Sequence, residues 1–338
     1  MPTGIFHSAL GSLQLCGLLL LWGSASAQTS PQYARADSVA ESLYGAPMED
    51  LYGLATQLTE GLPTEEEKFR AIYTWIVQNI KNDSQLYNRT MNARKRYAET
   101  PARLATWTRR MQPKIWDRLL TKKKTLCSGY AYLLSHLAEQ AGITAIPVAG
   151  YMRNSRANVG GEGFLNHHWN AVKLDGTWYL CDPTWSSGLY RLWGKKGWED
   201  PYFLLDPALF VLTHYPVDTT WLLLESPPGL DAFLQAPLVY PAAQQARLLP
   251  EGPSSFRLTE ETGNTIKFRF RQEADEALTQ LKLLWVADTG KDHEIWVPVQ
   301  FAEDGTTYVE YTFHWPGDYT VHLRKDHHFL LTYQIAVK

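Results

Sequence analysis

Three residue types that support nucleophilic thiol chemistry occur along this chain in the order cysteine, histidine, aspartate. Cys127 stands where a helix over residues 127–141 is expected to begin. The neighbouring residues His167 and His168 follow in a predicted strand, and Asp182 follows in the next one. A thiol attacks a carbonyl carbon, an imidazole moves the proton, and a carboxylate orients the imidazole. The pattern therefore predicts a catalytic Cys-His-Asp group.

A predicted hairpin selects one of the two histidines. The dipeptide Asp-Gly at 175–176 is a strong signal for a two-residue loop between antiparallel strands. Opposed residues of the two strands point to one side, and sides alternate along each strand. His167 then shares a face with Asp182, while His168 shares the other face with Cys181, behind the triad. A bulge or a three-residue turn would reverse this assignment.

The expected position of Cys127 favours its reactive form. The N–H groups at a helix N-terminus stabilise a thiolate and can hold a developing oxyanion. Two alternatives use Cys127 together with Cys181: a disulfide in an oxidising compartment, or a zinc site completed by a histidine. No close paired-ligand spacing supports zinc, so we expect neither a metal nor a cofactor. His214 and His293 are interpreted as structural or surface residues.

The elements that must position these groups can be recognised from sequence patterns. Residues 35–60 are loosely helical, and an amphipathic helix is predicted over 65–80, where glutamates fill the first turn. Gly142 ends the helix that begins at Cys127. A strand follows over 143–151.

Residues 89–124 form a strongly basic stretch before Cys127. It is either a solvated, partly helical insertion or a positive rim that favours the thiolate and attracts anionic substrates. Its cationic residues, opposed by Glu99 and Asp117 only, are Arg89, Arg94, Lys95, Arg96, Arg103, Arg109, Arg110, Lys114, Arg118, Lys122, Lys123 and Lys124.

The C-terminal third has a different residue composition and hydrophobic pattern. A proline-rich linker is predicted over 227–253, and short alternating segments separated by turn signals follow it. Strands at this spacing predict a β-sandwich. We expect Trp285, Trp296 and Trp315 to belong mostly to its core. The alternating segments lie at 266–270, 281–286, 294–299, 307–313, 319–323 and 329–335, with one turn at 304–305.

Composition bounds the class of protein. The chain has 338 residues, 45% of them hydrophobic, and 13 tryptophans, which indicates about two globular domains. A net charge of −3 gives no general case for binding nucleic acid. Residues 13–22 are apolar and 25–27 form a small-x-small cleavage site, so 1–27 are predicted to be a signal peptide. A buried N-terminal helix is the alternative. The mature chain is expected to lack a transmembrane segment and to be exported, periplasmic or extracellular.

Three motifs resemble the transglutaminase-like superfamily, which has a papain-like core. They are LCSGYA at 126–131, NHHWNAV at 166–172 and WYLCDPTW at 178–185. The family's histidine lies two residues before the tryptophan, which independently selects His167. Further motifs resemble the kyphoscoliosis peptidase-like branch: AIYTWI at 71–76, YFLLDP at 202–207, THYP at 213–216, and Trp221. The resemblance covers roughly 60–225 and implies a Cys127-His167-Asp182 triad.

The predicted architecture is therefore α+β, with a papain-like transglutaminase core followed by a small all-β, immunoglobulin-like sandwich. The expected function is acyl transfer from an amide or peptide bond through a cysteine thioester, resolved by water or by an amine. Its partner would be a protein or peptide, with cell-wall peptide as one candidate. The alternative is a non-catalytic scaffold or binding protein. The predicted segments are 1–27 (signal), 28–60 (helical lead-in), 61–226 (catalytic), 227–253 (linker) and 254–338 (sandwich).

Overall fold

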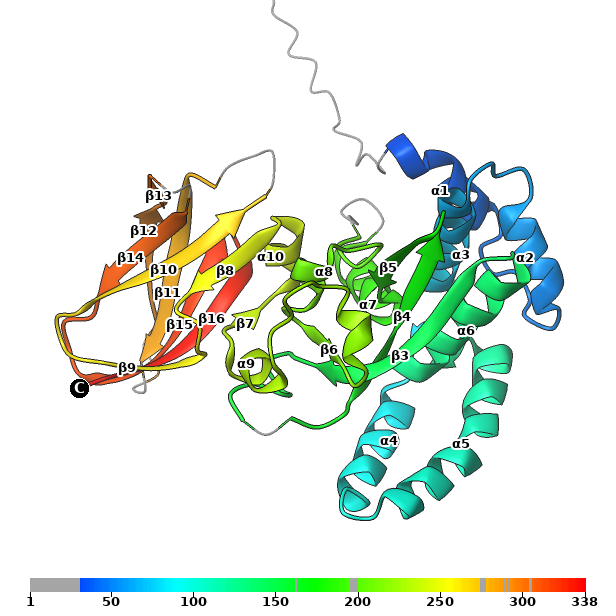
Figure 1. Cartoon of the computed structure of the whole chain (residues 1–338), viewed down its shortest axis with the longest axis horizontal. Helices are drawn as coiled ribbons and strands as arrows, with labels where there is room; N and C mark the ends of the chain where they lie inside the picture. Colours follow the sequence, from blue (N-terminus) through cyan, green and yellow to red (C-terminus); the bar gives the residue numbers. More distant parts are fainter. Residues whose placement is uncertain are drawn as a thin grey trace, which may run out of the picture.

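The structure, a computed structural model, describes residues 31–161, 163–194, 200–273, 278–287, 290, 292–303 and 306–338. The predicted signal peptide at 1–27 and the turn at 304–305 lie outside these residues. Figure 1 shows a domain of helices packed around a sheet and, at the other end of an elongated molecule, a β-sandwich. Within the described residues, no helix combines the length and apolar character needed to cross a membrane.

Four helical segments begin the described chain, as the sequence predicted for this region. They are η1 (Pro31–Tyr33), α1 (Ala34–Ser42), α2 (Leu51–Thr59) and α3 (Glu65–Asn79). Thr64 caps α3, since its hydroxyl accepts the Glu67 N–H at 3.1 Å. Three glutamates in the first turn stabilise the same helix end. Every residue of α3 from Phe69 onward is buried, so this helix forms the centre of the domain.

The basic stretch forms a helical hairpin of α4 (Ser84–Arg96) and α5 (Pro101–Lys122), which extends from the domain in Figure 1. Its two ends are joined by a short parallel pair, β1 (Lys81–Asn82) and β2 (Lys124–Thr125). Asp83 caps α4 by accepting the Leu86 N–H at 3.0 Å, and the same carboxylate pairs with Arg118 of α5. The hairpin is therefore anchored immediately before Cys127.

A four-stranded antiparallel sheet in the order β5-β4-β3-β6 carries the predicted site. One face of β4 packs against α3 and α6 through Val172 and Leu174. The other face contributes Trp169 and Ala171 to a second cluster with Phe210. The elements of this region are α6 (Cys127–Gln140), β3 (Thr144–Met152), β4 (His167–Leu174), β5 (Thr177–Cys181), α7 (Pro183–Trp193), α8 (Pro207–Phe210), β6 (His214–Pro216) and η3 (Thr219–Leu222).

The prediction that residues 227–253 form only a linker is wrong, because this segment contains helices and strands. It contains α9 (Leu230–Gln235), β7 (Leu238–Val239), α10 (Pro241–Gln245) and β8 (Leu248–Gly252). β7 pairs with β16 and β8 pairs with β10, so both belong to the sandwich. Each is the end strand in its sheet order. Prolines are tolerated in edge strands, which is why proline content misled the sequence interpretation.

The predicted β-sandwich is confirmed, with one sheet ordered β13-β14-β10-β8 and another ordered β12-β11-β15-β16-β7, in which β9 also pairs with β16. Phe268 and Phe270 of β10 are fully buried between the sheets. The strands are β9 (Arg257–Glu260), β10 (Thr265–Gln272), β11 (Gln280–Ala287), β12 (Asp292–Pro298), β13 (Gln300–Phe301), β14 (Thr307–Thr312), β15 (Gly317–Lys325) and β16 (His328–Val337).

Two of the three sandwich tryptophans that we expected in the core lie at the surface. Trp285 packs against the core cluster, but Trp296 and Trp315 are 54% and 71% exposed. Trp296 lies on β12, an edge strand, where the Lys282 ammonium stands 4.8 Å from its ring centroid. Val297, the next residue of β12, is buried, so alternation along the strand places Trp296 on the outer face of the sheet. Trp315 lies between β14 and β15 rather than in a strand.

Candidate active site

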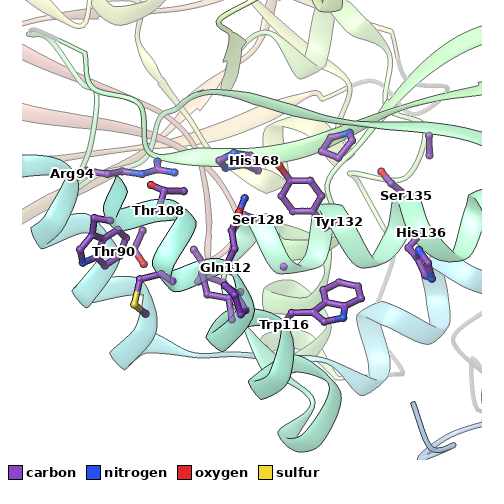
Figure 2. Close-up of a pocket in the computed structure, with 18 of the residues that line it drawn as sticks. Thr90, Arg94, Thr108, Gln112, Trp116, Ser128, Tyr132, Ser135, His136 and His168 are labelled. Atoms are coloured by element: carbon purple, nitrogen blue, oxygen red, sulfur yellow. The ribbon is translucent and has the colours of Figure 1, made fainter. Parts of the chain in front are cut away.

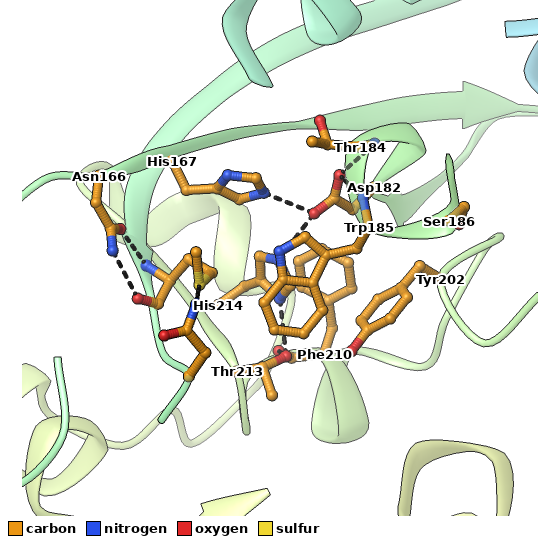
Figure 3. Close-up of polar contacts among 12 residues, drawn as sticks. Asn166, His167, Asp182, Thr184, Trp185, Ser186, Tyr202, Phe210, Thr213 and His214 are labelled. Carbon is orange, nitrogen blue, oxygen red and sulfur yellow. Dashed lines mark hydrogen bonds and ion pairs between the residues drawn. The ribbon is translucent and has the colours of Figure 1, made fainter. Parts of the chain in front are cut away.

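The hairpin of β4 and β5 has the register that the sequence predicted. Leu174 pairs with Thr177, and the loop residues Asp175 and Gly176 have φ of 46° and 85°. Positive φ at both positions defines the two-residue type I′ loop. His167 and Asp182 consequently meet, with His167 Nε2 2.6 Å from Asp182 Oδ2 (Figure 3).

Asp182 is the N-cap of α7 and is completely buried. Its Oδ1 accepts the N–H groups of Thr184 at 2.8 Å and Trp185 at 3.1 Å. Its Oδ2 contacts two imidazoles, His167 and His214. Burial would raise the pKa of this carboxyl group, but the charge and hydrogen bond of His167 and the contact with His214 lower it well below its usual range. Asp182 is therefore a fixed negative charge inside the protein.

His214 is the partner that the sequence interpretation missed. It is fully buried on β6, with Nε2 3.1 Å from Asp182 Oδ2 and Nδ1 2.8 Å from the Thr213 hydroxyl (Figure 3). Burial lowers its pKa to about 4, so the ring is neutral. Nε2–H then donates to Asp182, and Nδ1 accepts from Thr213, whose oxygen receives the Gln244 amide at 3.0 Å. The signal was present in the motif at 213–216, but His214 was taken for a structural or surface residue.

Cys127 is the first residue of α6, as predicted, and only 3% of it is exposed. The N-cap Leu126 offers no side-chain acceptor, so the first-turn N–H groups have no side-chain cap. Gly129 allows Thr125 to approach this turn, because a Cβ at residue 129 would lie 1.8 Å from the Thr125 hydroxyl oxygen. The sequence LCSG thus places a thiol at an uncapped helix end.

The pKa values of Cys127 and His167 move in opposite directions. Burial raises the pKa of Cys127, but hydrogen bonds and positive charge from His167 and His168 outweigh burial and bring it to about 5. Burial lowers the pKa of His167, but the charge of Asp182, with hydrogen bonds to Asp182 and Cys127, brings it to about 10. At neutral pH these groups form a thiolate–imidazolium pair.

His168 contacts the Cys127 thiol. This is contrary to the prediction, which placed His168 on the side of the strand away from the triad. The face of β4 that carries His168 also carries Asn170, whose amide donates to the Ala131 carbonyl oxygen at 2.9 Å. That contact shows that α6 covers this face. Cys127 begins α6, so His168 approaches it from one face of the strand while His167 reaches it from the other. The prediction that His167 and His168 lie on opposite faces of the strand was right, but the sequence alone did not reveal which face α6 covers.

Cys181 has the opposite electrostatic environment. It is completely buried, and burial together with the carboxylates of Asp182 and Asp200 raises its pKa well above the usual value. Cys127 and Cys181 are both free, so the disulfide alternative is wrong. The zinc alternative required both thiols together, whereas their side chains belong to different clusters.

His167, Asp182 and His214 form a group that could in principle hold a metal ion, because their ligand atoms lie within 4.8 Å of one another. Two of these distances, 2.6 Å and 3.1 Å, are those of hydrogen bonds. Ligand atoms around tetrahedral zinc are separated by about 3.3 Å, given bonds of about 2.0 Å. The arrangement fits a carboxylate that accepts from two imidazoles better than it fits a coordination shell.

Two cavities flank Cys127 beneath the helical hairpin. The larger, about 720 Å³, is lined by both sequence neighbours of Cys127 and by α5 (Figure 2). The smaller, about 640 Å³, is lined by His167 and His168. Leu86 and Met111 of the hairpin belong to the same buried apolar cluster as Cys127. On α4, burial and the nearby Cys127 raise the pKa of Tyr87. The predicted insertion therefore borders the thiol.

Residues 52–183 match the family described as the Transglutaminase-like superfamily. Within that class, the chain is similar to Kyphoscoliosis peptidase of Mus musculus and of Homo sapiens. Each is 32% identical over 185 residues, which cover 53% of this chain and 25% of the relative. Hillarin of Drosophila melanogaster is 24% identical over 227 residues, covering 62% and 25%. The matched segments thus span about a quarter of these relatives' length. These matches support the predicted resemblance to the transglutaminase-like superfamily and to its kyphoscoliosis peptidase-like branch.

Proposed function

We propose that this protein is a thiol enzyme that transfers the acyl group of an amide or peptide bond, with Cys127 as nucleophile, His167 as acid and base, and Asp182 as orienting carboxylate. The observation that carries the proposal is the 2.6 Å contact between His167 and Asp182 beside a thiol whose pKa is lowered to about 5. The match of residues 52–183 to the transglutaminase-like superfamily supports it.

The proposed reaction has two steps. The Cys127 thiolate attacks the carbonyl carbon, and the oxygen becomes an oxyanion that first-turn N–H groups of α6 can stabilise. The His167 imidazolium gives its proton to the amine as the carbon–nitrogen bond breaks, which leaves a thioester on Cys127. Water, deprotonated by His167, then attacks the thioester and restores the thiolate. An amine in place of water would form a new amide instead.

We favour hydrolysis, because no feature of the site marks selection of an amine. The proposed partner is a protein or peptide, with cell-wall peptide among the candidates. The proposed location is the periplasm or extracellular space, for which residues 1–27 are the only argument.

The alternative is a non-catalytic scaffold or binding protein, and one observation favours it. Cys127 is 3% exposed and lies in an apolar cluster with Leu86 and Met111, so a substrate must displace part of its surroundings to reach the sulfur. A scaffold would keep the thiol covered permanently.

One experiment separates the two functions. The protein and its Cys127→Ala variant are incubated with a peptide library, with and without a primary amine, and the products are identified by mass spectrometry. An enzyme gives cleaved or amine-modified peptides with the wild type and none with the variant. If iodoacetamide labels Cys127 and Cys181 equally slowly in the folded protein, the scaffold is favoured.

A further inference from the structure

The larger cavity beside Cys127 is formed by the helical hairpin and has a predominantly apolar lining. The hairpin contributes Trp107, Met111, Ile115 and Trp116 from α5, and α6 contributes Tyr132, which is 47% exposed. Its volume of about 720 Å³ is that of a ligand site rather than a packing gap. A cavity of this size with a mostly apolar lining and a few polar groups is typical of a ligand site.

The position of this cavity relates it to the proposed chemistry. Ser128 and Gly129, the residues directly after Cys127, line it, and Figure 2 shows Ser128 and His168 beside the same space. His168 also lines the smaller cavity, as do Arg94 and Thr108. These shared residues show that the two cavities adjoin at the level of the thiol. A chain crossing this junction would pass next to Cys127.

The charge around the junction is positive. Arg94 lines both cavities, and Lys95 lines the smaller one. The two helices of the hairpin carry many more basic than acidic residues, and Asp117 of α5 lines a different surface hollow. Glu139, near the C-terminal end of α6, also lines the larger cavity, so the positive charge belongs to the end that carries Arg94. A negative group on a bound chain would therefore be attracted to this end of the cleft.

We propose that the hairpin is the specificity element of the enzyme: the cleft binds a bulky apolar side chain of the peptide substrate, next to the bond that is attacked, and prefers an acidic neighbour at the Arg94 end. This inference rests on the proposed function, since it assigns the substrate class of the same site. It commits to one occupant, a peptide with adjoining apolar and acidic residues.

Thiol-directed reagents test the apolar part. The rate of Cys127 alkylation is measured with iodoacetamide and with N-(naphthylmethyl)iodoacetamide, each divided by its rate with free cysteine. We expect the naphthyl reagent to gain about tenfold or more, which corresponds to about 1.4 kcal/mol or more of binding. Equal normalised rates for the two reagents in the wild type would contradict an apolar binding site. The finding that another segment of the chain, or a second copy, already fills the cavity would contradict it too.

A matched pair of variants locates the effect. Thr108 and Thr106 are both exposed on α5, but only Thr108 lines the cavities. Thr108→Trp should bring the rate ratio toward one, whereas Thr106→Trp should retain the wild-type ratio. Should Thr108→Trp fail to fold by circular dichroism, Gln112→Trp fills the larger cavity from another exposed position. An unchanged ratio in the folded filling variant contradicts the proposal.

Charged reagents test the acidic preference. N-(4-carboxybenzyl)iodoacetamide should label Cys127 several-fold faster than its 4-aminomethyl counterpart at low salt, and the difference should shrink as salt is added. Arg94→Gln should reduce the preference. Equal rates for the two reagents overturn the charge assignment. Failure of these tests differs from failure of the proposed function, which would show as equally slow labelling of Cys127 and Cys181 by iodoacetamide itself.

Discussion

The two cysteines occupy equally closed but electrostatically opposite regions of the same domain. Cys127 is 3% exposed and Cys181 is completely buried. Imidazoles face the first, and the pKa of its thiol falls to about 5. Carboxylates face the second, and its pKa rises. Burial is thus common to both, and the sign of the neighbouring charge decides which thiol ionises.

The two histidines on Asp182 show the same principle. His167 and His214 contact the same carboxylate oxygen, at 2.6 Å and 3.1 Å. The shorter contact, with the thiol on the other side of the ring, raises the pKa of His167 to about 10, whereas burial lowers that of His214 to about 4. One imidazole is charged and faces the sulfur, and the other is neutral and holds the carboxylate.

The largest effect is expected when the negative charge of Asp182, which both histidines contact, is removed. Asp182→Asn should let the pKa of His167 fall and that of Cys127 rise, so the two thiols become more alike. We expect turnover of a substrate found by the peptide screen to drop by about 10³–10⁴-fold, as for a triad that loses its carboxylate.

Asp200→Asn is the matched control, because Asp200 acts on Cys181 and is not among the groups that lower the pKa of Cys127. Turnover that survives Asp182→Asn within a few-fold would show that this carboxylate does not support the chemistry.

The pH dependence of labelling tests the contrast next. The thiolate of Cys127 forms as pH rises through about 5, so its iodoacetamide rate should increase there and then level off once the thiol is ionised. Cys181 stays protonated across this window because its pKa is raised. At pH 7 Cys127 is ionised and Cys181 is not, so iodoacetamide should label Cys127 faster than Cys181.

In guanidinium the contrast should disappear, since both unfolded thiols ionise around pH 8.5. A folded-state rate for Cys127 that rises only at pH 8–9 contradicts the lowered pKa.

His214→Phe should have a smaller effect on turnover and on the pH at which Cys127 is labelled. It removes one donor from the buried Asp182 carboxylate while filling most of the space. A hydrogen bond to a charged group contributes about 1.5–3 kcal/mol, so we expect about a tenfold loss of turnover with an upward shift in the pH at which Cys127 is labelled.

Thr213→Val, which affects only the far side of the His214 ring, should shift that labelling pH less. A variant His214→Phe that is merely less stable, with an unchanged labelling profile, would make His214 a packing residue rather than a positioning one.

The smallest expected effect concerns the hairpin that borders Cys127 and leaves Cys181 untouched. Asp83→Ala removes the cap of α4 and the partner of Arg118. We expect a loss of about 1–2 kcal/mol in unfolding free energy and faster hydrogen exchange of the Leu86 amide. Asp117→Ala, an exposed change on α5, is the control. Unchanged exchange at Leu86 would mean that the hairpin is held by other contacts.

Local patterns predicted much of the fold and half of the site. The Asp-Gly loop determined the register that joins His167 to Asp182, and helix signals placed Cys127 at the start of α6. His214 could not be placed in the same way, because β6 has three residues and pairs with a strand far away in sequence. The position of His168 depended on which face α6 covers, and the cleft depended on how α4 and α5 fold back over Cys127. These are tertiary contacts without a local sequence signal.

The apolar cover over Cys127 has a consequence for the lifetime of the enzyme. Thiolates of low pKa react readily with peroxides and pass through sulfenic acid to irreversible sulfinic and sulfonic forms. Cys127 is 3% exposed and shares an apolar cluster with Leu86 and Met111, so oxidant in the surrounding medium has little direct access to the sulfur. Irreversible oxidation of Cys127 is therefore expected to be slower than that of an exposed thiolate of the same pKa.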